Sequence, residues 1–418
     1  MKQVKTVDKA IYLTLLLAGN LVFAADNSTG SSLVTDFWTA DSAKEQQSFG
    51  QRLIEESGNV SILYQWLKSG PEYAADVPKG YQESVRQSED GTRFPYVLLI
   101  PDTYDPAKSY AVEFMLHGGV SRPEWEAGGG WWRRGYDNLK NPDRITVVPA
   151  AWNDAFWWHA NQAENIPAIL KLVKKKYNVD DNRVYMTGVS DGGTGAYFFA
   201  FKQNTEWAAF MPFIAHPAVL QNSASGGGHM LYFENLMAKP LYIVNGEEDP
   251  LYPASSLLPF IEVLRSAEIS HEFTVIEGGG HNTRWLPDES SKIEQFKLDN
   301  PRDPLPETVQ WVTDSSDRYN RNHWVRVDEL ASENQPGKVY VQREGNSIYV
   351  TTFDVNAVTL LLNPEEINFS EPVAIYSNGE LRVSELITQD AATLLEWAGR
   401  DLDKSMLFTA EVKLRIAD

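Results

Sequence analysis

Three side chains of the kinds that perform nucleophilic catalysis stand in informative places in this sequence. Ser190 lies between glycines, Asp249 follows an apolar run, and His281 follows three consecutive glycines. A serine hydroxyl becomes an effective nucleophile when a histidine takes its proton and a carboxylate orients that histidine. We therefore predict that Ser190 is the nucleophile, His281 the general base and Asp249 the carboxylate. Glu247 and Glu248 are rival candidates for the carboxylate.

The residues around Ser190 favour a sharp turn from a strand into a helix. Residues 184–186 are typical of a buried strand and residues 194–201 of a helix, and Gly188 and Gly192 complete the pattern G-x-S-x-G. Glycines are needed there because the helix must cross close to the strand. An isolated pattern of this kind is often an ordinary turn, but the flanking strand and helix favour a catalytic serine.

A second stretch could stabilise the negative charge that develops when a serine attacks a carbonyl group. The apolar run 110–116 is typical of a strand, and it ends in His117, Gly118 and Gly119. Acyl transfer needs two N–H donors for the carbonyl oxygen, one from the residue after the nucleophile and one from the loop after an earlier strand. We expect Asp191 to supply the first donor and Gly118 or Gly119 the second.

Tryptophans crowd into the part of the chain that precedes the serine motif. Of the 13 tryptophans, nearly half lie between residues 125 and 158. Aromatic rings on loops beside a catalytic serine can line an acyl or sugar cleft. We expect the substrate to contact Trp131, Trp132, Trp157, Trp158 and His117. Packing in the core is the alternative for any one of these side chains.

The sequence predicts neither a metal site nor a cofactor. The chain has no cysteine, and its seven histidines are scattered without the pairing that is typical of zinc sites. Catalysis by serine, histidine and aspartate proceeds through an acyl-enzyme that water releases, so it requires no cofactor.

These motifs resemble those of the α/β-hydrolase superfamily. The stretches HGG at 117–119, GVSDGG at 188–193, NGEEDPLYP at 245–253 and GGGHN at 278–282 occur in the order expected for that fold. The chain is similar to exported esterases related to dienelactone hydrolases, feruloyl or acetylxylan esterases and polyhydroxyalkanoate depolymerases. It also resembles the catalytic domains of prolyl-oligopeptidase-type peptidases. The resemblance implies an α/β fold with a mostly parallel sheet flanked by helices, and hydrolysis of carboxylic esters through an acyl-enzyme.

The overall composition narrows the range of partners. The chain has 418 residues with 43% hydrophobic content, enough for more than one folded unit, and a formal net charge of -20 at pH 7. Such a charge repels nucleic acids and anionic membrane surfaces. We expect a small-molecule or polymeric ester as the partner, and the sequence makes no prediction of the oligomeric state.

The first residues are typical of an export signal. Lys2, Lys5 and Lys9 precede an apolar run that ends near Phe23, and small residues follow. The run is short for a transmembrane helix and contains Asn20, which argues against a stable membrane anchor. We predict that residues 1–24 are a cleaved signal peptide and that the protein is periplasmic or extracellular in a bacterium.

The rest of the chain divides by pattern into three units. Residues 25–80 have helical spacing and are expected to form an extension packed on the main domain. Residues 81–300 are the expected α/β-hydrolase catalytic domain, and a proline-rich stretch follows at 300–306. Residues 307–418 alternate as short strands, which predicts a small, mainly β domain. We expect this domain to stabilise the protein, because the sequence contains no cluster of exposed aromatic residues there.

Three functions are compatible with these features. An exported serine esterase accounts for the whole set of motifs. A serine peptidase of the same fold is the first alternative, but such peptidases usually carry a long propeller domain before the catalytic one. A catalytically silent binding protein is the second alternative, and it would tolerate loss of Ser190, Asp249 or His281, all of which are present.

Overall fold

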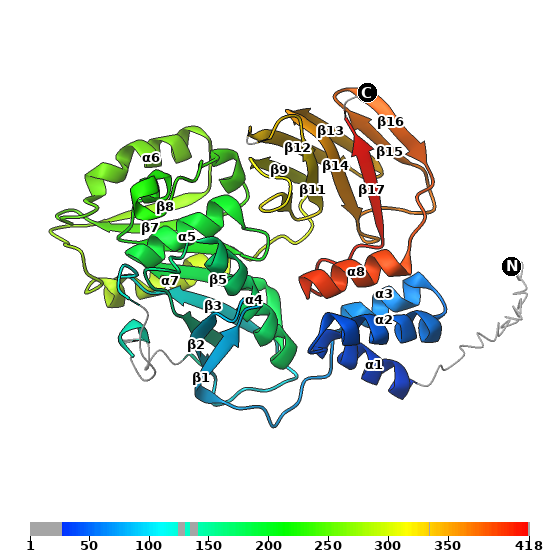
Figure 1. Cartoon of the computed structure of the whole chain (residues 1–418), viewed down its shortest axis with the longest axis horizontal. Coiled ribbons are helices and arrows are strands. Elements are labelled where there is room, and N and C mark those ends of the chain that lie inside the picture. Colours follow the sequence, from blue (N-terminus) through cyan, green and yellow to red (C-terminus); the bar gives the residue numbers. More distant parts are fainter. Residues whose placement is uncertain (1–26, 124–129, 134–140, 334, 417–418) are drawn as a thin grey trace, which may run out of the picture.

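The computed structural model describes residues 27–123, 130–133, 141–333 and 335–416. Three regions follow one another along the chain: N-terminal helices, an α/β region and a C-terminal β region (Figure 1). No helix in these ranges is both long enough and apolar enough to cross a membrane. The predicted signal peptide lies outside the described residues.

The α/β region is built on one sheet of eight strands in the order β1-β2-β4-β3-β5-β6-β7-β8. β1 and β2 form an antiparallel hairpin, and β2 pairs antiparallel with β4. The strands from β4 to β8 across the sheet are parallel. The strands are β1 (Gly80–Gln87), β2 (Arg93–Ile100), β3 (Tyr110–Leu116), β4 (Arg144–Pro149), β5 (Val179–Val189), β6 (Ala209–Phe213), β7 (Leu241–Gly246) and β8 (His271–Ile276).

Helices cover both faces of this sheet, as buried strands in a parallel sheet require. Apolar side chains of α4 (Ala160–Lys176), α5 (Asp191–Lys202) and α6 (Ala254–Ser266) share one core with strand residues. On the other face, α7 (Leu286–Asp299) packs against β5, β6 and β7. Short 3₁₀ turns lie at η1 (Trp131–Arg133), η2 (Pro217–Gln221), η3 (Ser223–Ser225) and η4 (Phe233–Leu236). The predicted fold class, a mostly parallel sheet flanked by helices, is confirmed.

The C-terminal β region consists of two sheets that share one core. The four-stranded sheet has the order β10-β11-β14-β17, and the five-stranded sheet has the order β16-β15-β13-β12-β9. Inward side chains of both sheets form one buried cluster, so the sheets pack face to face. The strands are β9 (Thr308–Thr313), β10 (Arg321–Asn322), β11 (Val325–Leu330), β12 (Gly337–Glu344), β13 (Ser347–Phe353), β14 (Val355–Leu362), β15 (Val373–Ser377), β16 (Glu380–Glu385) and β17 (Ala410–Arg415).

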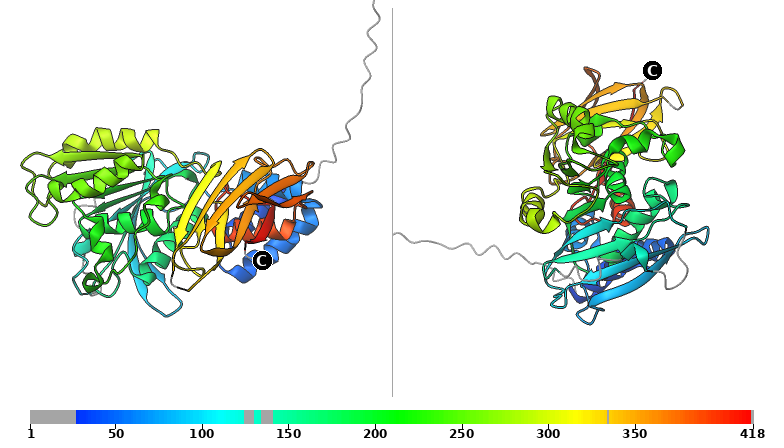
Figure 2. Two further views of the ribbon diagram at one scale, coloured as in Figure 1. Left: turned by 90° about the horizontal axis from the view of Figure 1, so that it is seen from above. Right: turned by 90° about the vertical axis from the view of Figure 1, so that its left-hand side faces the viewer.

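The N-terminal helices differ from expectation in their main packing partner. α1 (Asn27–Thr39), α2 (Ala43–Ser57) and α3 (Val60–Ser69) bury their apolar stripe mainly against α8 (Ala391–Asp401), a helix of the C-terminal region (Figures 1 and 2). Leu53 and Leu67 lie in one cluster with Leu394 and Ala398. Helical spacing in the sequence predicts the apolar stripe of these helices. It does not predict which other part of the protein the stripe packs against. The proposed boundaries of the three units remain predictions.

Candidate active site

Ser190 lies at the turn between β5 and α5 in a strained backbone conformation. Its φ of 57° and ψ of -120° are unusual for a residue with a side chain. A Cβ atom on Gly188 would lie 1.9 Å from the carbonyl oxygen of Gly192, and a Cβ atom on Gly192 would lie 1.9 Å from that of Leu116. Only glycines allow α5 to cross β3 and β5 this closely, which holds the serine at the end of the sheet.

His281 joins Ser190 to Asp249 through two hydrogen bonds. The distance from His281 Nε2 to Ser190 Oγ is 2.9 Å, and that from His281 Nδ1 to Asp249 Oδ2 is 2.8 Å. With the proton on Nδ1, the ring donates to Asp249 and accepts from the serine hydroxyl, the tautomer that general-base catalysis needs. The structure thus brings together three residues that are 91 and 32 positions apart in the chain.

The Asp249 carboxylate is fixed by hydrogen bonds, whereas Glu247 and Glu248, the other two candidates for the carboxylate, are exposed. The Asp249 side chain is buried, and its Oδ1 accepts the backbone N–H groups of Leu251 at 2.8 Å and Tyr252 at 3.0 Å. Glu247 and Glu248 are both exposed. Glu247 accepts the N–H of Gly278 instead of contacting the His281 ring. Of the three candidate carboxylates, Asp249 is the one that is hydrogen-bonded to His281.

The predicted oxyanion loop lies directly against the serine. A Cβ atom on Gly118 would be 2.9 Å from Ser190 Cβ and 3.5 Å from Ser190 Oγ, so the loop backbone approaches the nucleophile as closely as a glycine permits. As the first residue of α5, Asp191 carries a backbone N–H without an intrahelical acceptor. The N–H groups of Asp191 and of Gly118 or Gly119 therefore belong to two segments that meet at Ser190.

Asp191 also has a contact that the sequence did not reveal. Its Oδ2 accepts the backbone N–H of Val120 at 3.0 Å, so the side chain ties the start of α5 to the loop that carries Gly118 and Gly119. This bond occupies the Val120 donor, which leaves the two glycines as the remaining loop donors. The sequence shows an aspartate directly after Ser190, but it does not show the partner of that aspartate, because Val120 is 71 residues away.

His117, predicted to contact the substrate, is buried in the structure, and its contact with a substrate stays a prediction. Its side chain is 3% exposed, and its Nε2 accepts the N–H of Ala151 at 3.0 Å. The other ring nitrogen, Nδ1, lies 2.9 Å from the Gly118 carbonyl oxygen and donates to it. Burial lowers the pKa of His117 to about 4, and the charge of Arg122 acts in the same direction. His117 is thus a neutral, buried residue that fixes the oxyanion loop.

Three of the four predicted substrate-binding tryptophans are also buried in the structure. Trp157, Trp158 and Trp132 are 0%, 2% and 4% exposed. Trp157 Nε1 donates to the His117 carbonyl oxygen at 2.9 Å, and Trp158 Nε1 donates to that of Ser225 at 3.1 Å. Large aromatic side chains gain most by burial, and these three expose almost none of their surface. The structure gives them a packing role, and their contact with a substrate stays a prediction.

Trp131 is partly exposed and packs beside the loop that carries His117. The guanidinium of Arg122 lies 4.7 Å from the centre of the Trp131 ring, and the edge of that ring packs against His117. The Tyr252 ring lies 5.9 Å from that of His281. Burial, followed by the charges of Asp191 and Asp249, raises the pKa of Tyr252. Arg122 and Tyr252 are neighbours of the site that sequence reasoning missed.

No three histidine or acidic side chains in the described ranges lie close enough together to hold a metal ion.

Comparison with known proteins identifies one family. Residues 80–289 match the sequence profile of the dienelactone hydrolase family. A comparison with curated protein sequences finds no match.

Several solved structures resemble part of this chain at low identity. A thermostable esterase is 20% identical with a TM-score of 0.42, over 53% of this chain and 63% of that one. The S-formylglutathione hydrolase of Staphylococcus aureus is 20% identical with a TM-score of 0.41, over 53% of this chain and 99% of that one. Dipeptidyl peptidase 4 of Porphyromonas gingivalis is 14% identical with a TM-score of 0.40, over 57% of this chain and 37% of that one. The chain spans less than two thirds of the length of the esterase and of the peptidase.

Proposed function

Because this chain belongs to the dienelactone hydrolase family, we propose that it is a serine hydrolase that cleaves carboxylic esters through an acyl-enzyme. The observation that carries the proposal is the chain of hydrogen bonds from Asp249 through His281 to Ser190, with distances of 2.8 and 2.9 Å. A buried carboxylate, an imidazole and a hydroxyl in this order are the parts that acyl transfer needs.

The proposed reaction begins with attack of Ser190 Oγ on the ester carbonyl carbon. His281 Nε2 takes the hydroxyl proton, and Asp249 stabilises the resulting imidazolium. The tetrahedral intermediate collapses when His281 returns the proton to the leaving alcohol. A water molecule, activated by the same histidine, then attacks the acyl-enzyme and releases the acid.

The oxyanion of the tetrahedral intermediate would be bound by the backbone N–H of Asp191 and by that of Gly118 or Gly119. Each such donor contributes roughly 2.7–4 kcal/mol to transition-state stabilisation in serine hydrolases. The Asp191 carboxylate holds the loop in position through the N–H of Val120. Its negative charge next to the nucleophile disfavours anionic acyl groups, so we expect a neutral ester at the reacting centre.

The same proposal includes export. Residues 1–24 have the charge and apolar pattern of a cleaved signal peptide. N-terminal sequencing of protein secreted by a bacterial host checks this point, since detection of Lys2 in the mature protein would contradict it.

Labelling with a fluorophosphonate tests the proposed chemistry. The full-length protein is expected to react, and the Ser190→Ala variant is expected not to. Hydrolysis of p-nitrophenyl esters of increasing acyl length then measures the size of the acyl pocket. Asp249→Asn should lower kcat about 10⁴-fold, whereas Glu248→Gln should leave it nearly unchanged. Absence of labelling in the folded protein would reject the proposal in favour of a silent binding protein.

A further inference from the structure

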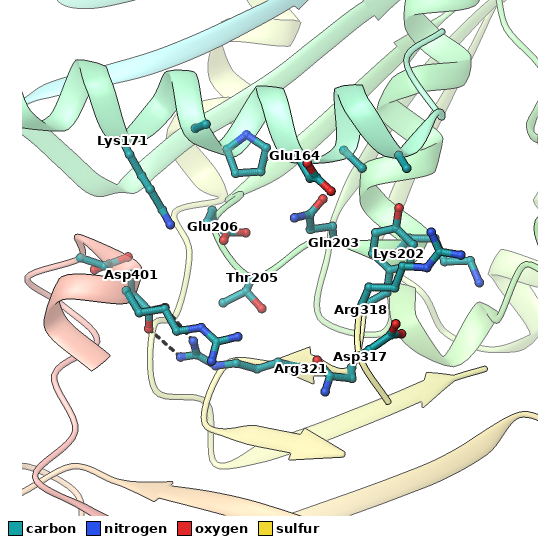
Figure 3. A pocket seen from close by; sticks show the side chains of 18 of the residues that line it. Glu164, Lys171, Lys202, Gln203, Thr205, Glu206, Asp317, Arg318, Arg321 and Asp401 are labelled. Carbon is teal, nitrogen blue, oxygen red and sulfur yellow. Dashed lines mark hydrogen bonds and ion pairs between the residues drawn. The ribbon is translucent and has the colours of Figure 1, made fainter. Parts of the chain in front are cut away.

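A pocket of 380 Å³ lies between the α/β region and the C-terminal region, away from the candidate active site (Figure 3). Its walls come from α4, from the end of α5, from the loop between β9 and β10, and from the end of α8. Ser190 precedes the first residue of α5, and Lys202 at the last residue lines the pocket. A helix of 12 residues is about 18 Å long, so the two sites are separate.

On the α4 wall of this pocket, small apolar side chains lie beside Glu164 and Lys171. Ala160, Ala163, Pro167 and Ala168 follow one another at helical spacing and all line the pocket. Because these side chains are small, they leave room for the pocket. They also offer an apolar surface against which the C–H groups of a ligand can pack.

Polar atoms without partners surround the same space. The Lys171 ammonium has no hydrogen-bond or ion-pair partner among the residues that the structure describes, and burial lowers its pKa despite the nearby charge of Glu206. Glu206 Oε2 and Gln203 Oε1 are buried and accept no hydrogen bond within the described part of the chain. Buried polar atoms of native proteins are nearly always hydrogen-bonded, so the Glu206 and Gln203 oxygens call for a partner. The Lys171 side chain is only partly buried, and it lines the same pocket.

The signs of charge alternate across the pocket. Figure 3 shows Lys171 at one end, Lys202 and Arg318 at the other, and Glu164 and Glu206 between them. Arg321 and Asp401 neutralise each other through two hydrogen bonds of 2.7 Å. An anionic ligand would meet the two glutamates, and a cationic ligand would meet the lysines and arginines, so neither is favoured.

Hydroxyl groups satisfy this arrangement because each one can both donate and accept a hydrogen bond. We propose that the pocket binds a neutral saccharide, whose hydroxyl groups donate to Glu206 and Gln203 and accept from Lys171. A zwitterion such as a dipeptide would need cations gathered at one end of the pocket and carboxylates at the other. The volume lies in the range of about 300–1,000 Å³ that small-molecule sites occupy.

The pocket that would hold such a ligand is lined by two regions of the chain. Lys171 and Glu206 belong to the α/β region, whereas Arg318 and Arg321 belong to the C-terminal region. The proposal therefore gives the junction of the α/β region and the C-terminal region a binding function that is independent of ester hydrolysis. Saccharide binding goes beyond the proposed function, and it could occur whether or not the protein hydrolyses esters.

Binding is best measured in the full-length Ser190→Ala variant, so that hydrolysis cannot affect the result. A microarray of neutral oligosaccharides selects the probe, and calorimetric titration then gives its Kd. Lys171→Met is expected to weaken binding at least ten-fold. Lys176→Met is the matched control, because Lys176 lies on the same helix but is exposed and sits over the Tyr177 ring at 5.7 Å.

A second readout does not depend on substitutions. Acetylation of lysines, followed by mass spectrometry, should show that the bound saccharide protects Lys171 and leaves Lys176 reactive. The proposal is overturned if no neutral saccharide binds, or if Lys171→Met binds as tightly as its parent. It is also overturned if glycylglycine or glucuronate occupies the pocket in preference to every neutral saccharide.

Discussion

Asp191 combines two roles at the residue scale. Its backbone N–H, at the start of α5, is a donor that we propose for the oxyanion, and its side chain accepts the N–H of Val120 at 3.0 Å. Because Val120 is 1% exposed, its N–H would have no substitute partner if the carboxylate were removed. The side chain is therefore a positioning group for the loop that contains Gly118 and Gly119.

We predict that Asp191→Ala lowers kcat by about 10- to 100-fold with little change in KM. The reason is that a displaced loop donor weakens binding of the transition state more than binding of the substrate. Asp191→Asn should restore most of the activity, since its amide oxygen can accept the same N–H group. Steady-state kinetics with p-nitrophenyl acetate measure both parameters. If the asparagine variant is as impaired as the alanine variant, the negative charge matters rather than the hydrogen bond.

His117 makes the folded state sensitive to acid. Burial holds its pKa at about 4, below the ordinary value of 6.5. Between these two pH values the unfolded chain binds a proton that the folded protein does not, so the free energy of unfolding decreases as the pH falls. The full effect of this one site is about 3 kcal/mol, reached near pH 4.

We predict that His117→Gln flattens the pH dependence of stability between pH 6.5 and 4. The glutamine amide can accept the Ala151 N–H without binding a proton in the unfolded chain. Urea unfolding of both proteins at several pH values gives the comparison. Equal slopes in the two proteins would show that His117 is not a source of acid sensitivity.

At the scale of elements, the closest packing in the site is that of α5 on the sheet. The helix begins immediately after Ser190, and its second residue, Gly192, lies against the end of β3. β7 and β8 are neighbours in the sheet, so the loops that carry Asp249 and His281 emerge side by side. The catalytic arrangement thus depends on how α5, β7 and β8 are placed.

We predict that Gly192→Ala destabilises the protein by at least about 3 kcal/mol, because the new Cβ atom would lie 1.9 Å from the Leu116 carbonyl oxygen. Gly280→Ala is the control, since its nearest neighbour would be 3.6 Å away, at the Asn282 side chain. Thermal unfolding of both variants measures the difference. Similar melting temperatures would show that α5 can move away from the sheet at little cost.

At the scale of the whole molecule, a buried ion cluster joins the α/β region to the C-terminal region. Asp403 lies 2.7 Å from Arg302 and 3.7 Å from Lys174, and Lys174 lies 2.8 Å from Asp181. Burial alone would raise the pKa of Asp403, but Arg302 and Lys174 outweigh burial and keep this pKa below its ordinary value. The cluster therefore resists separation of the two regions.

We predict that Asp403→Ala destabilises the protein by about 3–5 kcal/mol, because two buried cations would share a single carboxylate. Glu262→Gln is the control, since Glu262 pairs with Arg265 on the exposed surface of α6, where such pairs contribute about 0–1 kcal/mol. Chemical denaturation followed by tryptophan fluorescence measures both. A small effect of Asp403→Ala would indicate that the two regions are held together by apolar contacts alone.

The sequence by itself was sufficient for the fold class and for the residues of the candidate triad. Both depend on local patterns: glycines around Ser190, apolar runs of strand length, and the order in which Ser190, Asp249 and His281 occur. Such patterns act through the backbone of neighbouring residues, so they can be recognised without knowledge of distant contacts. The α/β fold is confirmed, whereas the roles of the three residues stay predictions until activity is measured.

Only the tertiary structure decided which side chains are available to a ligand. Trp157 is enclosed while Trp131 stays partly exposed, although both are tryptophans in the same stretch of sequence. The N-terminal helices pack mainly against α8, and the proposed saccharide pocket is lined by segments up to 246 residues apart, from Ala160 to Met406, that no local pattern connects. Burial is the sum of many weak contacts between distant segments, and it is therefore a property of the assembled molecule rather than of any single motif.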